Sequence, residues 1–301
     1  MSDHVVVVGA SGFIGSHLVT ELHHGRTLTP VGRLPADGSS AEGSRSNSGS
    51  HPDWSQILRP GTTVLWSAGA TTPSSSSMSV SAEVDANIAP LVRLLEAARR
   101  QPPIRLVFLS TGGAIYGDVL EDMATEDTVI EPKSYYSAGK AAAEAFLYAW
   151  ARQEGHCAIV LRASNVYGSG QPYRPGFGII PTAFHAIRSG APVAIRGDGE
   201  SIRDYLHVDD LSRLVARILT TPVMPGATTY NASSREGVSL NELFARIESV
   251  TGLSVPRTYH PSSPFDVRRI VLDNAKASRA FGWRPSVDLE TGLRRAWAAF
   301  A

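Results

Sequence analysis

The stretch that decides the fold of this chain is VVVVGASGFIG, residues 5–15. Its four valines form the continuous apolar run of a strand that is buried on both faces of a sheet, and a helical pattern follows. Gly9 permits a tight turn, Gly12 lets the backbone approach a pyrophosphate, and Gly15 lets the new helix pack closely on the sheet. The free N–H groups of that helix would face the anion. We therefore predict that a dinucleotide contacts Gly9, Gly12, Phe13, Ile14 and Gly15.

Outward from this loop, short β-rich runs alternate with helical stretches. Strands are expected at 4–8, 28–32, 63–67, 105–110 and 158–162, and helices at 13–23, 84–100 and 136–153. This alternation is typical of an α/β protein with a doubly wound parallel sheet. After residue 168 the sequence becomes irregular and richer in Pro and Gly, which predicts a smaller C-terminal lobe. Residues 35–52 and 71–79 lack apolar anchors and are expected to be loops.

The composition narrows the class of protein. With 28 basic and 28 acidic residues among 301, the chain has no net field to attract nucleic acid or an acidic membrane. No apolar run has the roughly 20 residues that a membrane helix needs, and the first residues show no signal-peptide pattern. Cys157 is the only cysteine, which excludes an internal disulfide and a multi-cysteine metal site. These observations predict a soluble, cytoplasmic protein without a bound metal.

The end of the second strand bears on which dinucleotide binds. An acidic residue at this place would bond the adenosine ribose, but residues 27–37 read TLTPVGRLPAD and offer Arg33 instead. A guanidinium could pair with a 2′-phosphate, which favours NADP over NAD. Arg33 could equally be a solvated loop residue. The sequence therefore leaves NAD and NADP open, with a preference for NADP.

A tyrosine and a lysine four residues apart, Tyr136 and Lys140, lie in the segment SYYSAGK at 134–140. On a helix they share one face, whereas Tyr135 projects elsewhere. A phenol titrates near 10, and a cationic amine close to it lowers that pKa. The pair therefore suits proton exchange with a carbinol oxygen while hydride moves to or from a nicotinamide. A tyrosine and a lysine at this spacing are common on surface helices, so the pair indicates catalysis only in combination with the other motifs of the chain.

The motifs together resemble the extended short-chain dehydrogenase/reductase family, in particular its NAD(P)-dependent nucleotide-sugar epimerase/dehydratase branch. The resemblance spans nearly the whole chain and rests on GASGFIG, VLWSAGA, Asn87, LSTGGAIYG, YSAGK, LRASNVYG, GDGESIRDYLHVDD and FGWRPSVDLETGL, in that order. It implies that residues 1–168, with a returning segment around 204–222, form a dinucleotide-binding Rossmann domain. Residues 169–301 would mainly form a substrate-binding lobe.

The resemblance also implies roles for residues on the cofactor side of the site. Tyr136 would be the acid and base of the reaction, and Lys140 would tune it and bond the nicotinamide ribose. Ala68, Gly69 and Asn87 would line the cofactor groove and its supporting helix. The family further implies a homodimer that forms through the helices at 84–100 and 136–153.

On the substrate side, Asn165 would contact a sugar nucleotide and Arg203 its diphosphate. The family often has the pattern R-x-x-D near the C-terminus, with the arginine on the diphosphate. Here the matching stretch is SPFD, so Ser263 replaces the arginine while Asp266 stays. An arginine at 268 or 269 could substitute. Loss of a bidentate phosphate contact points to a less usual substrate.

A second departure concerns the donor that usually assists the tyrosine. The family places a Ser or Thr where this chain has Gly112, and a glycine has no side chain to donate. Thr111 is the predicted replacement and Ser110 the alternative, although Thr111 should point to the other strand face unless the backbone kinks. The dehydratases and decarboxylases of the family carry carboxylates here, whereas this chain has Gly113 and Ala114. Elimination of water is therefore not expected.

Three functions remain open at this stage. The first is a nucleotide-sugar epimerase that takes hydride from a ring carbon, C4 in our prediction, and returns it to the other face. The second is an NADPH-dependent reductase of a 4-keto sugar nucleotide, which the arginine at 33 would suit. The third is a non-catalytic Rossmann protein that senses dinucleotide, although such proteins usually lose the tyrosine or the lysine.

Overall fold

The computed structural model describes residues 4–23, 25–32, 34, 51–71, 79–120, 122–262 and 266–300. Arg33, Ser263 and most of the stretches 35–52 and 71–79 lie outside these residues. The chain divides into two compact units, each assembled from three segments. The first unit contains Met1–Ser110, Ser134–Leu161 and Val215–Thr229, and the second contains Thr111–Lys133, Arg162–Leu214 and Tyr230–Ala301. The assignment of cofactor binding and substrate binding to separate domains stays a prediction.

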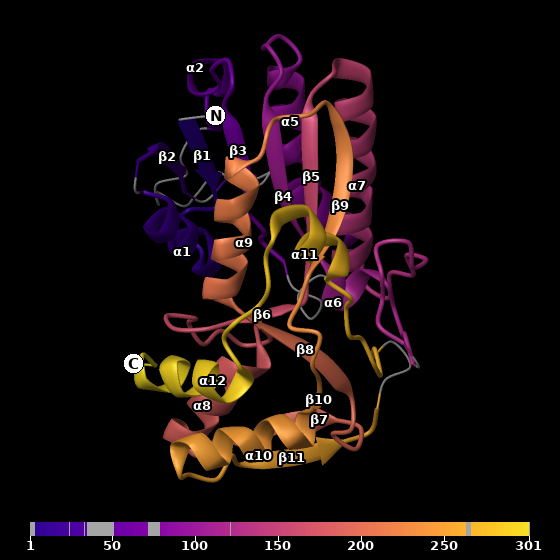
Figure 1. Ribbon diagram of the computed structural model, residues 1–301. Coiled ribbons are helices and arrows are strands. Elements are labelled where there is room, and N and C mark those ends of the chain that lie inside the picture. The colour runs from indigo at the N-terminus through magenta and orange to yellow at the C-terminus, as the bar shows by residue number, and fades with distance from the viewer. Residues whose placement is uncertain are drawn as a thin grey trace, which may run out of the picture. The chain divides into compact units, whose positions relative to one another are not determined.

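A six-stranded sheet carries the predicted glycine loop (Figure 1). Its strands, in spatial order, are β2 (Thr27–Val31), β1 (His4–Val8), β3 (Thr63–Trp66), β4 (Arg105–Thr111), β5 (Cys157–Ala163) and β9 (Gly226–Ala232). Strand β1 pairs in parallel with β2 and β3, and β3 pairs in parallel with β4. The predicted α/β fold with a parallel sheet is confirmed.

The valines of β1 show how the sheet is covered on both faces. All four, Val5 to Val8, are completely buried. Val6 and Val8 belong to a core that contains leucines of α5 (Ala89–Ala98) and α7 (Tyr135–Glu154). Val5 and Val7 point to the opposite face because side chains alternate along a strand. Helix α1 (Phe13–Leu22) follows the glycine loop.

Helix α7 begins and ends where its sequence provides caps. Ser134 accepts a hydrogen bond from the Ser137 N–H, and the Ser137 hydroxyl accepts one from the Ser134 N–H, which is a capping box. Gly155 closes the helix in the left-handed conformation, with φ of 71°. The observed helix exceeds the predicted 136–153 by one residue at each end.

The helix predicted at 84–100 differs from its expectation. It begins earlier, as α4 (Val80–Glu83), continues through a π-helical turn η1 (Val84–Ile88) and ends as α5 at Ala98. Ser79 caps α4 by accepting from the Ala82 N–H. Hydrophobic periodicity does not distinguish one π turn from α-helix, so the sequence predicted a single element here. Such turns occur frequently at functional sites.

The second unit contains two small sheets, in the orders β10-β8-β6 and β11-β7. These strands are β6 (Asn165–Tyr167), β7 (Val193–Arg196), β8 (Ile202–His207), β10 (Gly237–Ser239) and β11 (Arg257–His260). Its helices include α8 (Ile179–Ser189), α10 (Leu240–Thr251) and α12 (Leu289–Ala298), which share a core with β7 and β8. None of the helices in the described part of the chain is long and apolar enough to cross a membrane.

Candidate active site

The glycine loop joins β1 to α1 through a turn that only glycine fits. Gly9 has φ of 84°, a conformation that residues with a side chain rarely adopt. The N–H groups of Gly9 and Ala10 both donate to the Val31 carbonyl, at 2.9 and 3.0 Å. A Cβ at Gly9 would lie 2.7 Å from the Ala68 nitrogen, and a Cβ at Gly15 would lie 2.1 Å from the Gly9 oxygen. The backbone segments therefore touch at both positions.

The start of α1 fits the pyrophosphate of a dinucleotide. Gly12 is the N-cap, and no side chain bonds the helix terminus there. The first turn, which begins with Phe13 and Ile14, contains no acidic residue. Its N–H groups and the helix dipole therefore remain available to an anion. A Cβ at Gly12 would meet only the Gly9 oxygen, at 3.2 Å, and the exposed backbone at Gly12 lets a phosphate approach.

The loop after β3 is held by Asn87. This residue lies in the π turn η1, and its Oδ1 accepts a hydrogen bond of 2.9 Å from the Ala70 N–H. Ala68 is half-buried and Gly69 is exposed, so the loop offers backbone to a ligand. A Cβ at Gly69 would have no neighbour within 4 Å. Asn87 thus fixes the loop after β3, while its predicted place in a cofactor groove stays a prediction.

Tyr136 and Lys140 lie in the first turns of α7. Tyr136 is half-buried, whereas only 8% of Lys140 is exposed. The Lys140 Nζ donates to the Leu109 carbonyl at 2.9 Å and lies 4.8 Å from the centre of the Phe108 ring. Both contacts come from β4. The amine is therefore anchored against the end of that strand, one helical turn after the tyrosine.

Two buried carboxylates near Lys140 were not singled out from the sequence. Glu83 is 2% exposed and Glu144 is 1% exposed. Burial lowers the pKa of Lys140 to about 8, although both carboxylates act to raise it. Glu144 lies four residues after Lys140, so helical spacing could have identified it. Glu83 is distant from Lys140 in sequence, and the only spacing signal for it was its place four residues before Asn87.

Ser110 and Thr111 differ in what their hydroxyl groups can do. Ser110 Oγ donates to Glu144 Oε1 at 2.5 Å, so its proton is already used within the protein. Thr111 is the last residue of β4 and keeps an extended backbone, with φ of −126° and ψ of 111°. The two side chains therefore point to opposite faces of the strand. The kink that the sequence suggested begins only at Gly112, where α6 (Gly112–Ile115) starts.

The double glycine is explained by its neighbours in the second unit. A Cβ at Gly112 would lie 2.3 Å from a methyl of Leu272, which is completely buried. A Cβ at Gly113 would lie 3.2 Å from Asn165 Oδ1. Leu272 therefore fills the space that a serine at 112 would need. Asn165 is half-buried at the start of β6.

Arg203 is held in the second unit by backbone oxygens. Its guanidinium donates to the carbonyls of Ile202 and Val267. Burial lowers its pKa, while nearby groups that include Asp118 and Asp266 act in the opposite direction. Asp266, which belongs to the predicted substrate site, is exposed on the segment that supplies the Val267 carbonyl.

The two arginines considered as replacements for the missing one differ in availability. Arg269 donates to the carbonyls of Val119 and Asp122, at 2.7 and 2.6 Å. Arg268 is largely exposed and contacts Asp198 at 3.5 Å. Arg268 is therefore the more accessible cation of the two.

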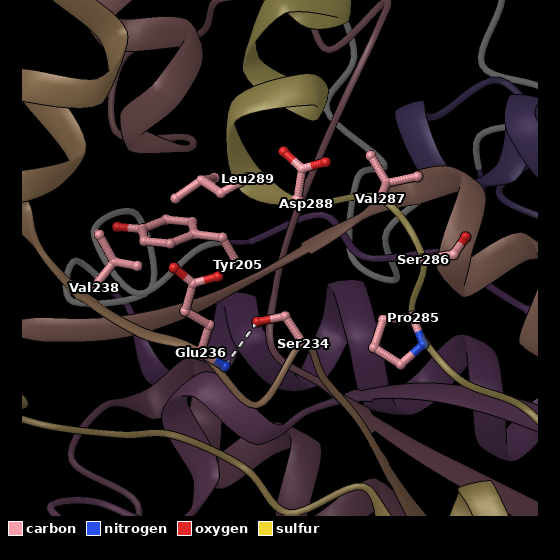
Figure 2. Close-up of a pocket in the computed structure, with 9 residues that line it drawn as sticks. All are labelled: Tyr205, Ser234, Glu236, Val238, Pro285, Ser286, Val287, Asp288 and Leu289. Atoms are coloured by element: carbon pink, nitrogen blue, oxygen red, sulfur yellow. Dashed lines mark hydrogen bonds between the residues drawn. The ribbon is translucent and has the colours of Figure 1, made fainter.

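A pocket of about 230 Å³ lies within the second unit, and two of its lining residues pair with predicted site residues, Val238 with Arg203 and Tyr205 with Asn165 (Figure 2). It is lined by Tyr205, Ser234, Glu236, Val238 and the segment 285–289. Figure 2 shows the Ser234 hydroxyl accepting from the Glu236 N–H. Glu236 also pairs with an arginine of α10, and Asp288 caps α12. The acidic side chains of this pocket thus serve the protein's own structure.

The predicted site residues fall into two groups. The first unit contains the glycine loop, Ala68, Gly69, Asn87, Tyr136 and Lys140. The second unit contains Thr111, Asn165, Arg203 and Asp266. Among the described residues, no group of three or more His, Cys, Asp or Glu is placed to hold a metal ion.

Comparison with known proteins connects this arrangement to characterised enzymes. The chain is 32% identical to UDP-glucose 4-epimerase of Mycolicibacterium smegmatis over 69% of its own length and 66% of that relative. It is thus matched to just under two thirds of that relative's length. The structure of UDP-glucose 4-epimerase from Thermotoga maritima with UDP-glucose superposes with a TM-score of 0.85, at 30% identity over 98% of both chains. That of the Thermus thermophilus UDP-glucose 4-epimerase with NAD gives 0.84, at 30% identity over 99% of this chain and 98% of that one.

Residues 5–233 match the sequence pattern described as the NAD dependent epimerase/dehydratase family. This range includes the glycine loop, Asn87, the Tyr136–Lys140 pair, Asn165 and Arg203. The expected resemblance is confirmed: the chain belongs to the NAD dependent epimerase/dehydratase family, a group of enzymes with the extended short-chain dehydrogenase/reductase fold.

Proposed function

We propose that the chain is an NAD-dependent nucleotide-sugar 4-epimerase in which Tyr136 is the acid and base. The observation that carries this proposal is the buried amine of Lys140, which lies one helical turn after Tyr136 and is anchored to the end of β4. A charged amine at this place stabilises the phenolate form of a neighbouring tyrosine. The tyrosine can then accept a proton at a pH where a free phenol would not.

The glycine loop and the first turn of α1 would hold the dinucleotide by its pyrophosphate. When bound, the nicotinamide supplies reversible hydride transfer, which oxidises a sugar carbinol to a ketone and reduces the ketone again. NAD is the proposed cofactor, supported by the family and by its presence in the Thermus thermophilus structure. The NADP preference that Arg33 suggested concerns a residue outside the described part of the chain.

The proposed roles of the chain's residues all concern one proton, that of the C4 hydroxyl group of the sugar. Tyr136 would take the proton of the C4 hydroxyl during oxidation and return it to the oxygen after the keto sugar has turned over. Thr111 is the proposed second donor to this oxygen, because the Ser110 proton is donated to Glu144. Lys140 would keep Tyr136 reactive and bond the nicotinamide ribose.

The residues after Thr111 favour epimerisation over elimination of water. Elimination needs an acid and a base placed beside the sugar, and Gly112, Gly113 and Ala114 provide neither. A carboxylate at 112 would collide with Leu272, and one at 113 would displace Asn165. The space beside the proposed donor is thus already filled by apolar or amide groups.

The proposed substrate is a UDP-hexose, by analogy with the relatives named above. Asn165 would contact the sugar nucleotide, and Arg203 would meet its diphosphate with Asp266 nearby. The accessible Arg268 is the candidate for the diphosphate contact that Ser263 cannot make. A homodimer through the helices predicted at 84–100 and 136–153, which are η1 with α5 and α7, is also proposed, since Val84 and Phe146 there are 43% and 49% exposed.

Purified protein incubated with UDP-glucose, UDP-galactose or UDP-N-acetylglucosamine tests the proposal. We expect the C4 epimer to form with catalytic NAD and without net production of NADH, measured by NMR of the products and by absorbance. Steady oxidation of NADPH with a 4-keto sugar nucleotide, and no epimer from any hexose, would contradict the proposal and favour the reductase.

A further inference from the structure

A buried carboxylate, Glu83, connects two parts of the predicted cofactor groove. It is the last residue of α4, immediately before the π turn. Its Oε1 accepts a hydrogen bond of 2.9 Å from Asn87 Nδ2, and its Oε2 accepts one of 2.5 Å from the Thr71 hydroxyl. Asn87 Nδ2 also donates to Thr71 Oγ1 at 2.7 Å. The carboxylate thus orients the same Asn87 whose Oδ1 holds Ala70 in the loop after β3.

The same carboxylate lies against α7 at Gly139. A Cβ at Gly139 would come 2.4 Å from Glu83 Oε1 and 3.0 Å from its Cδ. The carboxylate therefore occupies the space that any side chain at 139 would need. Glycine in a helix interior costs roughly 1 kcal/mol relative to alanine. Position 139, directly before Lys140, is a glycine because the Glu83 carboxylate needs this space.

The surroundings of Lys140 show what the carboxylate contributes. Strand β4 presents a carbonyl, from Leu109, and the ring of Phe108. The charged groups that act on the amine are Glu83 from α4 and Glu144 from α7. Burial alone favours the neutral amine, and these carboxylates oppose it. Glu144 also accepts a hydrogen bond from the Ser110 hydroxyl. Glu83 instead accepts one from Asn87, the residue that holds the loop after β3.

We propose that Glu83 is a positioning residue of this site, which keeps Lys140 in its ammonium form and fixes Asn87 against the loop after β3. The proposal assigns Glu83 no contact with substrate, so it acts through Lys140 and Asn87. This role rests on the proposed function for its use in catalysis, but its effects on Lys140 and on the loop exist without substrate. One carboxylate thus has two effects: it favours the charged form of Lys140, and it orients the asparagine that holds the loop beside the predicted dinucleotide groove.

The test is a pH titration of the lysine amines by NMR in the protein without substrate. The chain contains only three lysines, Lys133, Lys140 and Lys276, so each signal can be assigned with Lys133→Arg and Lys276→Arg. We expect Glu83→Gln to lower the pKa of Lys140 by about one unit below the wild-type value near 8. Glu96→Gln removes an exposed carboxylate of α5 and should leave it unchanged. An unchanged Lys140 pKa in Glu83→Gln would overturn the proposal.

Gly139→Ala provides a second variant that keeps the charge and displaces it. The methyl group of alanine would occupy the space in which the Glu83 carboxylate lies, so the carboxylate must move away from Lys140. We therefore expect the Lys140 pKa to shift downward as it does in Glu83→Gln. The usual gain in stability from alanine in a helix interior should be offset by this displacement. If Glu83→Gln does not fold, this variant decides the proposal alone, and an unshifted Lys140 signal would refute it.

Two further measurements separate the role of Glu83 from the proposed function. Glu83→Gln should weaken NAD binding, measured by calorimetry, by about tenfold, since a charged hydrogen bond that orients Asn87 is lost. The alkaline limb of the pH–activity profile should move to lower pH by the shift seen for Lys140. If wild type shows no epimerase activity while the lysine shift and the weaker binding are observed, the proposed function fails and the role of Glu83 stands. If wild type is active and the Lys140 pKa is unshifted in Glu83→Gln, the role of Glu83 fails and the proposed function stands.

Discussion

Tyr135 and Tyr136 are adjacent residues with different surroundings. Tyr135 is 47% exposed, whereas Tyr136 is half-buried and lies one turn before Lys140. Tyr136 is the one predicted to use the charge of that lysine, because residues four apart share a helix face and residues five apart do not. The pair Tyr135 and Tyr136 therefore offers a matched comparison at a single site.

Replacing Tyr136 with Phe should lower kcat for epimerisation by about 10²- to 10⁴-fold, since the proton-transferring hydroxyl is removed. NAD binding should change little, because the predicted pyrophosphate contacts are in the glycine loop. Tyr135→Phe is the control and should keep near wild-type kcat. Steady-state kinetics with the active hexose decides this. Equal losses in both variants would exclude Tyr136 as the acid and base.

At the residue scale the sequence predicted the Tyr136–Lys140 pair but not the two buried carboxylates, Glu83 and Glu144, that act on Lys140. Tyr136 and Lys140 are adjacent on one helix, so their spacing is visible in the sequence. Glu83 reaches the same place from another helix, through a contact that spans 56 residues of sequence and leaves no periodic signal. Gly139 was the sequence feature that could have indicated this contact, because a glycine inside a predicted helix often marks the close approach of another group.

Among the elements, the β1–α1 turn depends most on the absence of side chains. Gly15→Ala should destabilise the protein by about 1–3 kcal/mol, because its methyl group would lie 2.1 Å from the Gly9 oxygen. Gly32→Ala is the control, since a Cβ there has no neighbour closer than 4.0 Å. Urea denaturation measures both, and NAD binding should be lost only in the first. Equal stability of the two variants would contradict the close approach.

The connection between α7 and β5 contains a histidine that should make stability depend on pH. His156 is 1% exposed and stacks on Trp150 with 4.3 Å between ring centres, and its Nδ1 accepts from the Ile104 N–H. Burial lowers its pKa, so the folded protein resists the proton that the unfolded chain takes up near 6.5. The unfolded state then binds more protons, and stability falls as the pH decreases below about 6.5.

His156→Gln should reduce this loss, because the amide can accept from the Ile104 N–H but does not titrate. Urea unfolding between pH 7.5 and 5 should show a slope smaller by up to about 1.4 kcal/mol per pH unit. Some slope should remain from His4, whose pKa is also lowered by burial. Parallel curves for wild type and variant would show that His156 does not cause the loss.

The elements themselves were largely predictable, and the exceptions have physical reasons. The strands at 4–8 and 63–67 and the helix at 136–153 have continuous apolar runs or strong caps, and the structure places them within about a residue of prediction. The π turn that contains Asn87 was not predicted, because one π turn leaves the hydrophobic periodicity of a helix almost unchanged. The small sheets of the second unit pair strands of three to six residues, too short for a periodic signal.

For the whole molecule, the proposed homodimer predicts a measurable mass. Light scattering after size exclusion should give about twice the chain mass of 32.1 kDa. Phe146→Glu, at an exposed position of α7, should shift the protein toward monomer because a charge is costly to bury in an interface. Leu253→Glu alters a similarly exposed residue of the second unit and should not. A monomeric wild type at micromolar concentration would rule out this assembly.

The position of β9 has a consequence for synthesis on the ribosome. The seven-residue strand β5 lies between β4 and β9 in the sheet, but β9 is translated more than sixty residues after β5. Until it emerges, the nascent chain carries β5 as an open edge with unpaired backbone groups, which other chains can join. Slow translation or heat stress during this interval should therefore place the growing polypeptide among the clients of chaperones that shield such edges.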